Sequence, residues 1–252
     1  MKSNIRKWML AAGLLTGFAV WTLGVCLVDV GEIGPQDTSV GLSSINQWFH
    51  GLTGVNLSLY VLTDWLGLLP VGICAGFGTL GLTQWIRRRS IWKVDKSLLI
   101  LGCIYLLMLV FYLLFEKMPI NYRPVLIDGN LEASYPSSTT LLTVGVMATA
   151  MMQCGERMRK GLLKKSLLAA MAAFTAFMIL GRVWAGVHWI SDIAGGLLLG
   201  LGLAALYAAW IESLRKESKQ DKNGMKKTRL CIQPKNRKTL LTNSRNGLKL
   251  YP

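Results

Sequence analysis

Long charge-free apolar blocks alternate with short polar segments along most of this chain. Five blocks run 19 to 22 residues without a charged residue, and a sixth, shorter block is extended by an apolar flank toward Trp184. About 20 apolar residues in a helix cross the roughly 30 Å hydrocarbon core of a bilayer, where backbone hydrogen bonds must close within each segment. We therefore predict an all-α polytopic membrane protein with six transmembrane helices. The blocks are Trp8–Val28, Trp65–Ile86, Ser97–Phe115, Ser137–Gly155, Ser166–Gly181 and Ile193–Ile211.

The first block has two interpretations, because Lys2, Arg6 and Lys7 form a basic flank before it. Such a flank also begins a secretory signal peptide. However, the apolar run is longer than the roughly 7–15 residues of a typical signal-peptide core, and no Ala-x-Ala-like cleavage site closes it. We therefore expect a retained first transmembrane helix.

The polar connections differ sharply in charge, and this difference predicts an orientation. Segment 29–56 carries acidic residues and no Lys or Arg, whereas cations collect at the N-terminus and in the connections 87–96 and 157–165. The positive-inside rule places both termini and the basic connections in the cytoplasm. Segments 29–56, 116–136 and 182–192 then face the extracytoplasmic side of the cell membrane together.

The net charge of +15 comes mainly from the C-terminal tail. Residues 212–252 contain twelve Lys or Arg against three acidic residues, a surplus of +9. A basic, Asn-rich tail after a last helix is typical of a disordered anchor attracted to anionic lipid, and no folded nucleic-acid-binding module is visible. We therefore expect a membrane domain over 1–211, a disordered cytoplasmic tail over 212–252, and no nucleic-acid partner.

The five cysteines and two histidines of the chain change this picture little. Four cysteines fall in or at the ends of apolar blocks and the fifth lies in the tail, with neither a disulfide pattern nor metal-ligand spacing. Two histidines without a Cys/His cluster do not suit a zinc site. We expect no metal and no cofactor.

Candidate chemistry is concentrated in residues 182–192, between the last two apolar blocks. This segment holds Arg182, His188 and Asp192. The last two are four residues apart, a spacing that places side chains in contact on one face of a helix. An imidazole oriented by a carboxylate, beside a guanidinium, suits nucleophilic attack on phosphorus with an anion clamp. Charge decoration of a helix end would explain Arg182, but not a carboxylate placed to contact a histidine.

A second polar segment, residues 116–140, lies on the same expected face. Lys117 and Arg123 are cations where the positive-inside bias gives no reason to expect them. The run Pro136–Ser138 precedes the fourth apolar block, and a helix start offers free backbone N–H groups and a dipole that favour an anion. Ser137 is equally an ordinary N-cap residue. Together the two segments predict a phosphate-binding site at the outer surface.

The order Lys, Arg-Pro, then Pro-Ser-x-x, then Arg-x5-His-x3-Asp resembles the three-part signature of the type 2 phosphatidic acid phosphatase superfamily. The resemblance covers roughly residues 57–211, with the signature region at 117–192, and extends to the bacterial undecaprenyl-diphosphatase-like branch. It implies a metal-independent membrane phosphatase with six helices and an outward-facing site. Its third part is matched completely by Arg182, His188 and Asp192.

The resemblance also implies roles for the matching residues. His188 would be the nucleophile that forms a phosphohistidine, and Asp192 would orient and stabilise its imidazole. The phosphate oxygens would be held by side chains and by the backbone at the start of the fourth helix. These phosphate-binding residues are Lys117, Arg123, Ser137, Ser138 and Arg182.

Lys117 departs from the family pattern, because five residues separate it from Arg123 where the family usually has six. Glu116 occupies the usual lysine position. A long, flexible lysine stem can absorb a one-residue shift, but Lys117 is a less secure phosphate ligand than Arg123 or Arg182.

Thr139 is the larger departure. The second part of the family signature normally reads Pro-Ser-Gly-His, and its histidine protonates the leaving group; Thr139 stands in that catalytic position. Loss of a positioned general acid costs about 10²–10⁴-fold. The chain is then a non-catalytic lipid-phosphate-binding pseudophosphatase, or it uses a replacement acid, His50 or Glu132, or its substrate needs less protonation. A diphosphate expels a phosphate monoester, whose last pKa is about 6, whereas a phosphomonoester expels an alkoxide.

We therefore expect a lipid phosphate or diphosphate phosphatase that acts at the extracytoplasmic face, with undecaprenyl diphosphate as the favoured substrate. The pseudophosphatase is the alternative, and a membrane transporter is a further one. Transporters often carry charges midway along broken helices. Here Asp64 is the only acidic candidate near an apolar block, and it precedes the second block rather than interrupting it.

Overall fold

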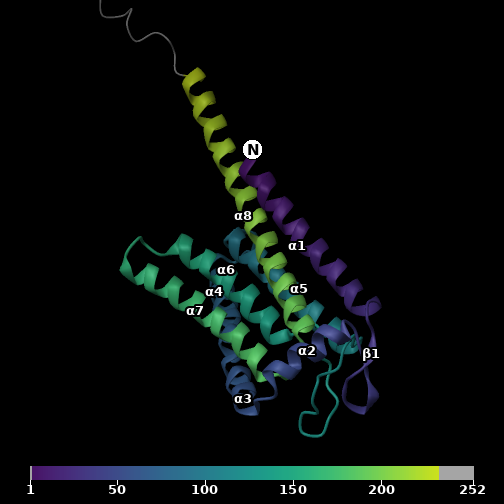
Figure 1. The fold of residues 1–252 in the computed structure, drawn as a ribbon. Helices are drawn as coiled ribbons and strands as arrows, with labels where there is room; N and C mark the ends of the chain where they lie inside the picture. Colours follow the sequence, from purple (N-terminus) through teal and green to yellow (C-terminus); the bar gives the residue numbers. More distant parts are fainter. Residues whose placement is uncertain (1, 233–252) are drawn as a thin grey trace, which may run out of the picture. The chain divides into compact units, whose positions relative to one another are not determined.

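The computed structural model describes residues 2–232 as a set of helices with one short two-stranded sheet (Figure 1). Strands β1 (Gly31–Glu32) and β2 (Ser39–Val40) pair antiparallel, and two short 3₁₀ helices are η1 (Pro35–Asp37) and η2 (Ile91–Lys93). The chain divides into two compact units, Met1–Ile211 and Glu212–Pro252. The α-helices are α1 (Lys2–Leu27), α2 (Ser43–Thr53), α3 (Leu57–Leu66), α4 (Leu68–Arg88), α5 (Lys96–Lys117), α6 (Ser138–Arg157), α7 (Leu162–Ala185) and α8 (Ile190–Ile232).

Five stretches of helix in the described residues are long and apolar enough to cross a membrane, so the protein is a multi-pass membrane protein. We predicted six, and α6 is the one that does not qualify. Its buried positions include several polar residues, which lower its hydropathy because a helix enclosed by other helices needs less apolar surface than one facing lipid. The five stretches are Asn4–Leu27, Leu57–Arg88, Lys96–Lys117, Leu162–Ala185 and Ile190–Glu217. The buried polar residues of α6 are Thr140, Thr143, Thr149 and Gln153.

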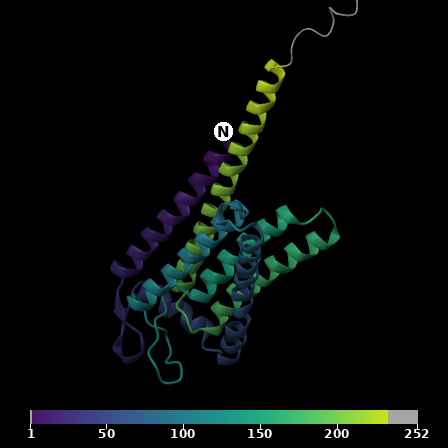
Figure 2. The ribbon, with the colours of Figure 1, turned by 180° about the vertical axis from the view of Figure 1, so that it is seen from behind.

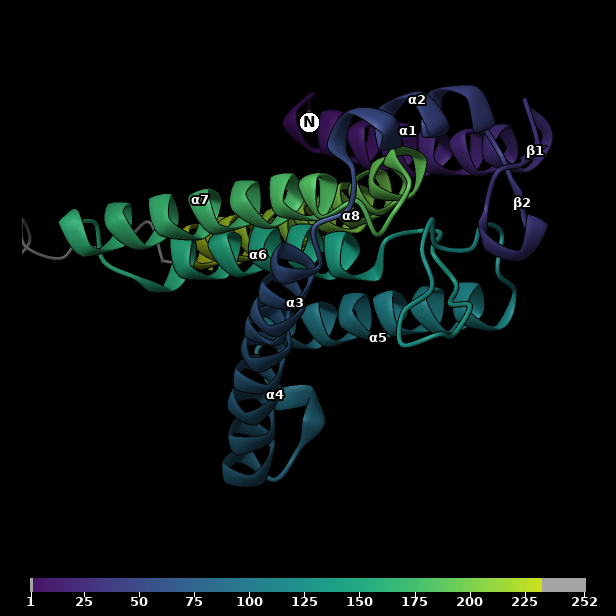
Figure 3. The same ribbon diagram turned by 60° about the horizontal axis from the view of Figure 1, so that its bottom comes forward.

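The second predicted helix begins earlier than the apolar pattern indicated. Helices α3 and α4 follow one another as a single candidate span, interrupted only at Gly67 (Figure 3). Asn56 caps the start of α3, because its side chain accepts a hydrogen bond from the Leu59 amide at 2.9 Å. Asp64 therefore lies inside a candidate span, and the expectation that it precedes one was wrong.

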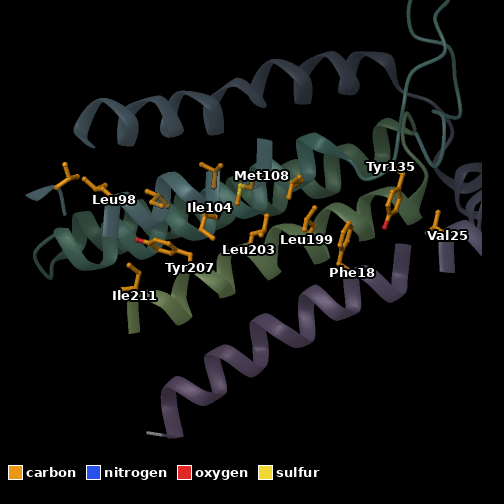
Figure 4. Packing of buried hydrophobic residues seen from close by; sticks show 14 residues of the cluster. Phe18, Val25, Leu98, Ile104, Met108, Tyr135, Leu199, Leu203, Tyr207 and Ile211 are labelled. Atoms are coloured by element: carbon orange, nitrogen blue, oxygen red, sulfur yellow. The ribbon is translucent and has the colours of Figure 1, made fainter. Parts of the chain in front are cut away.

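The core of the first unit forms where α1, α5, α6 and α8 meet (Figure 4). Phe18 of α1, Met108 of α5 and Leu199 of α8 are buried there. Helix α8 approaches α6 closely through glycines, since a Cβ atom at Gly196 would lie 2.6 Å from the Ser137 carbonyl oxygen. Small residues allow membrane helices this close approach. The contact fixes the beginning of α8 against the beginning of α6.

Three connecting segments meet at one end of the first unit, as Figures 1 and 2 show for residues 29–56 and 118–137. The buried Asn46 side chain of α2 donates to the Gly41 carbonyl at 2.8 Å and to Ser191 Oγ at 2.9 Å. The Asn121 side-chain oxygen accepts from the Gly41 amide at 3.2 Å. These bonds hold the three polar connections together, while the side of the membrane on which they lie remains a prediction.

Helix α8 continues beyond the apolar span to Ile232. Residues 212–232 are therefore helical in a segment for which we expected disorder. A helix once started is extended by one hydrogen bond for each added residue, so it often outlasts its apolar part. The remaining residues of the expected tail, 233–252, lie outside the described residues.

Candidate active site

His188 and Asp192 come from the connection between α7 and α8. Helix α7 ends at Ala185, and Gly186 follows in a left-handed conformation with φ of 64°. A Cβ atom there would lie 1.8 Å from the Gly54 carbonyl oxygen, so only glycine fits this turn. His188 lies in the bend that follows, and Asp192 lies in the first turn of α8. The two residues do not share a helix, contrary to the reasoning from their spacing.

Asp192 is fully buried, and its carboxylate accepts hydrogen bonds from four donors, one of which is the Ser191 hydroxyl at 3.4 Å from Oδ1. Its Oδ2 accepts from the Trp189 backbone amide at 3.0 Å, and its Oδ1 accepts from Asn121 Nδ2 at 3.0 Å. Ser134 Oγ donates to Oδ2 at 2.5 Å. These donors compensate the buried carboxylate for the water that it loses.

Ser134 links Asp192 to His188. The Oγ atom that donates to Asp192 also lies 3.0 Å from His188 Nδ1. His188 is only 5% exposed and Ser134 only 2% exposed, so water is largely kept from this chain of contacts. The carboxylate and the imidazole are therefore linked through a serine that the sequence analysis did not select, where the sequence predicted direct contact.

Arg182 lies buried in the last turn of α7 and reaches the beginning of α6 and the second half of α3. Its Nη2 donates to Thr139 Oγ1 at 2.7 Å, and its Nη1 donates to Thr63 Oγ1 at 3.3 Å. Nη2 also lies 3.5 Å from a carboxylate oxygen of the half-exposed Asp64. Asp64 is thus a partner of Arg182 within the site, which accounts for a charge inside a membrane span without a transport pathway.

Arg123 belongs to the connection between α5 and α6. Its Nε lies 3.1 Å from Glu132 Oε2, and its side chain is largely buried. The guanidinium carbon lies 5.5 Å from the centre of the Tyr60 ring, and that of Arg182 lies 5.2 Å from the same ring. Such distances are within the range of cation–π attraction. Tyr60, which the sequence analysis did not select, brings the two arginines into one cluster.

The beginning of α6 contributes through its backbone and its hydroxyl groups. The Ser137 amide already donates to the Asp192 carbonyl at 3.0 Å, and the Ser137 hydroxyl accepts from Thr140 at 3.0 Å. Ser137 therefore joins α6 to α8. Amide groups in the first turn of a helix have no partner within it, so the amides from Ser138 onward are the ones oriented to bind an anion.

A small cavity of about 20 Å³ adjoins His188. Ser134, Ser138 and Glu116 also line it. Lys117 is exposed, lines no part of this cavity, and makes none of the contacts described above. Because α5 remains helical through Lys117, neighbouring residues point about 100° apart. Glu116 therefore lines the cavity where the family's lysine would be expected, and a phosphate-binding role for Lys117 stays a prediction.

Burial and two nearby arginines change the pKa of His188. Burial lowers the pKa of His188 well below its ordinary value, the charges of Arg123 and Arg182 lower it further, and Ser134 opposes the shift. The imidazole is thus neutral near pH 7. A neutral imidazole has a nitrogen lone pair, which nucleophilic attack requires.

The two residues proposed as replacement acids have other partners in this structure. His50 Nε2 lies 3.1 Å from the Gly186 carbonyl oxygen, and its ring packs against Trp189 at 5.5 Å. Glu132 pairs with Arg123. Both residues thus stabilise the connections around the site, and His50 also lines another small cavity, of about 10 Å³, that His188 borders.

Comparison with known proteins gives one family and one solved structure. Residues 112–216 match the model of the PAP2 superfamily. No curated protein matches the chain. The solved structure of a transmembrane PAP2-type phosphatidylglycerolphosphate phosphatase from Bacillus subtilis covers 81% of this chain and 96% of its own, at 19% identity and a TM-score of 0.48. The family match includes α6, α7, the start of α8 and all three residues Arg182, His188 and Asp192.

Proposed function

We propose that the chain, whose residues 112–216 match the PAP2 superfamily model, is a lipid phosphate phosphatase that removes phosphate from a lipid diphosphate through a phosphohistidine at His188. The reaction needs no metal in this proposal, because arginines and helix amides supply the positive charge. The favoured substrate is an isoprenyl diphosphate of the undecaprenyl type, and the favoured location is the extracytoplasmic face.

One observation carries the proposal. Among the described residues, five buried side-chain nitrogen or oxygen atoms make no hydrogen bond, and four of them belong to Arg123, Arg182 and His188. Unsatisfied polar groups in a protein interior are rare and costly. One anion with several oxygen atoms would accept hydrogen bonds from the guanidinium nitrogens, and its phosphorus is the atom that the lone pair of a neutral imidazole can attack. A phosphoryl group has this charge and this number of acceptors.

The proposed chemistry has two displacements. His188 Nε2 forms a bond to phosphorus while the bond from phosphorus to the leaving oxygen breaks, and that oxygen takes the electron pair. Water then attacks the phosphorus of the phosphohistidine, the electron pair of the N–P bond returns to Nε2, and the proton that the water loses passes to the released phosphate monoester or to solvent. Arg123 and Arg182 stabilise the charge on the phosphoryl oxygens in both steps.

Thr139 supports a diphosphate as the substrate. Its hydroxyl accepts a hydrogen bond from Arg182 at 2.7 Å. In this proposal Thr139 therefore positions the arginine and does not protonate the leaving group. A phosphate monoester leaves with little help, since its last pKa is about 6. An alkoxide needs a proton during bond cleavage. Without the family's histidine, the former is the easier reaction.

The substrate preference is tested by phosphate release from purified protein in detergent. We expect isoprenyl diphosphates to be cleaved at least about 10²-fold faster than the matching isoprenyl monophosphates, the lower bound for a missing general acid. His188→Ala provides the blank for contaminating phosphatases. A preference for monophosphates would refute the leaving-group argument. Binding of both lipids with no phosphate release would favour the pseudophosphatase.

The expected face is tested by labelling single cysteines in a Cys-free background. Asn130→Cys in the connection beside the site should react with a membrane-impermeant thiol reagent in intact cells. Ser90→Cys, in the connection at the other end of α5, should react only after lysis. The reverse pattern would place the site in the cytoplasm.

A further inference from the structure

We propose that Ser134 is a positioning residue that holds His188 in the nucleophilic tautomer and transmits the charge of Asp192 to it. The inference rests on the proposed role of His188 and extends it to a residue outside the signature. The geometry that carries it is the single hydroxyl group that contacts both Asp192 Oδ2 and His188 Nδ1, at 2.5 and 3.0 Å.

The direction of each hydrogen bond follows from the number of protons available. A carboxylate accepts hydrogen bonds and donates none. Asp192 Oδ2 already accepts from the Trp189 amide, which can only donate. Ser134 has one hydroxyl proton, and it donates this proton to Asp192. The serine oxygen must then accept from His188, so the imidazole proton lies on Nδ1.

The tautomer decides which nitrogen reacts. With its proton on Nδ1, the neutral ring carries its lone pair on Nε2. Nε2 is also the ring atom that is buried and makes no hydrogen bond in the described residues. The serine therefore leaves the reactive nitrogen free, while a proton on Nε2 would block the attack on phosphorus.

Ser134 also contributes after the bond to phosphorus has formed. The ring of a phosphohistidine that keeps its Nδ1 proton is cationic. The Nδ1–H group continues to donate to Ser134 Oγ, whose own proton is held by the Asp192 carboxylate. No proton needs to leave the ring, and the negative charge of Asp192 stabilises the cation through the polarised hydroxyl group.

The backbone around Ser134 holds the hydroxyl in place. The Ser134 amide donates to the Asn121 carbonyl at 2.9 Å, and Tyr122 pairs with Ala133 across an antiparallel bridge. The Asn121 side chain in turn donates to Asp192. The connection thus forms a local hairpin whose two sides both end on the same carboxylate.

The first test is kinetic and uses the lipid diphosphate assay. Ser134→Ala should lower kcat by about 10–100-fold, the usual cost of removing an outer partner that orients a histidine, with KM within about twofold. Ser134→Thr, which keeps the hydroxyl group, should recover most of the loss. Ser43→Ala, a buried serine at the same end of the protein that bonds Asp29, is the matched control and should behave as wild type.

The second test needs no turnover. The chain has two histidines, so nitrogen-15 labelling of histidine gives two imidazoles in solution NMR, and His50→Gln identifies the signals of His188. We expect a protonated Nδ1 and an unprotonated Nε2 in the wild-type protein, and a mixture of the two tautomers in Ser134→Ala. This measurement decides the proposal even if Ser134→Ala is too unstable for kinetics, because the wild-type spectrum alone assigns the proton.

Two results would overturn the role of Ser134. One is a Ser134→Ala enzyme with wild-type kcat, and the other is a wild-type His188 with its proton on Nε2. Both leave the proposed function intact as long as His188→Ala is inactive. Full activity of His188→Ala would instead refute the phosphohistidine mechanism, and with it the reason for a positioned tautomer.

Discussion

Arginine clusters lie at both ends of the first unit, and they differ in burial and in the number of carboxylates. At the end that holds His188, the Arg182 side chain is 1% exposed and the Arg123 side chain 11%, and each has a carboxylate partner that is itself 58% or 41% exposed. At the other end, Asp95 lies between Arg88 and Arg157 at 3.3 and 3.4 Å, and all three side chains are 34–44% exposed.

This difference is the one expected between a candidate phosphate-binding site and a structural contact. Water screens the partly exposed cations around Asp95, so these ion pairs contribute little and leave nothing unsatisfied. The buried guanidinium groups near His188 keep nitrogen atoms without a hydrogen bond, although each has a carboxylate nearby. The protein itself does not fully compensate the positive charge of these buried arginines. An anionic substrate could supply the missing negative charge and hydrogen-bond acceptors.

The strongest test of this comparison is removal of the nucleophile. His188→Ala should abolish phosphate release, because the ring nitrogen forms the bond to phosphorus. Asp192→Asn should lower kcat by roughly 10⁴-fold while leaving detectable activity, as expected for loss of a carboxylate that orients a histidine. Both variants should keep the wild-type elution volume in detergent. Turnover in His188→Ala equal to wild type would rule out the mechanism.

Removal of one site arginine should have a smaller effect and also change the pH dependence. Arg123→Gln removes the largest charge effect that lowers the His188 pKa, and it should reduce kcat/KM by about 10²–10³-fold. Activity requires the neutral imidazole, so it is present above this pKa and lost as pH falls through it. The acidic limb of the pH profile should therefore move to higher pH in the variant.

The control for that experiment is Arg157→Gln at the opposite end, which should leave both kcat/KM and the acidic limb unchanged. An acidic limb of Arg123→Gln at the same pH as wild type would show that the arginine does not act on His188. Both variants are compared on one substrate, because the substrate phosphate also titrates.

Thr139 should have an intermediate effect if it serves Arg182. Thr139→Val keeps the shape of the side chain and removes the acceptor at 2.7 Å from Nη2. Loss of a hydrogen bond to a charged group corresponds to about tenfold or slightly more in kcat/KM. Thr139→Ser should be close to wild type. Equal activity of Thr139→Val and wild type would remove Thr139 from the site.

The smallest effect is expected at the opposite end. Asp95→Asn should leave kcat unchanged and lower stability by about 1 kcal/mol or less, measured as a small decrease in apparent Tm. The hydrogen bond from Gln84, followed by the nearby arginines, holds the pKa of Asp95 below its ordinary value of 3.8. Its contribution is thus present above that value and lost only as pH falls further. A loss of catalysis in Asp95→Asn would undermine the distinction between the two ends.

The sequence predicted much of the helical framework because its signal is local. Charge-free runs of about 20 residues identify membrane helices regardless of their neighbours, and the five candidate spans confirm five of the six blocks. The exception, α6, shows the limit of this reasoning. Its apolar run was long enough, but the polar residues on it face other helices, and only packing shows which faces are enclosed.

For the site, the sequence supplied the reactive residue types and the structure decided how they meet. Arg182, His188 and Asp192 stand close together in the chain, and Arg123 and Thr139 could be matched by their motifs. Ser134 contacts His188 across 54 positions, and Thr63 contacts Arg182 across 119. No local pattern records such distant contacts, since they depend on the paths of the connections between helices.

Glu116 and Lys117 show the same difference between what the sequence determines and what the structure decides. The sequence by itself determined that a cation and a carboxylate stand side by side at the end of an apolar helix. Which of them lines the cavity was decided by how far α5 continues and by its rotation against α6, because one helical residue turns a side chain by about 100°. The packing of the whole helix sets that rotation, so the identity of two neighbouring residues cannot predict it.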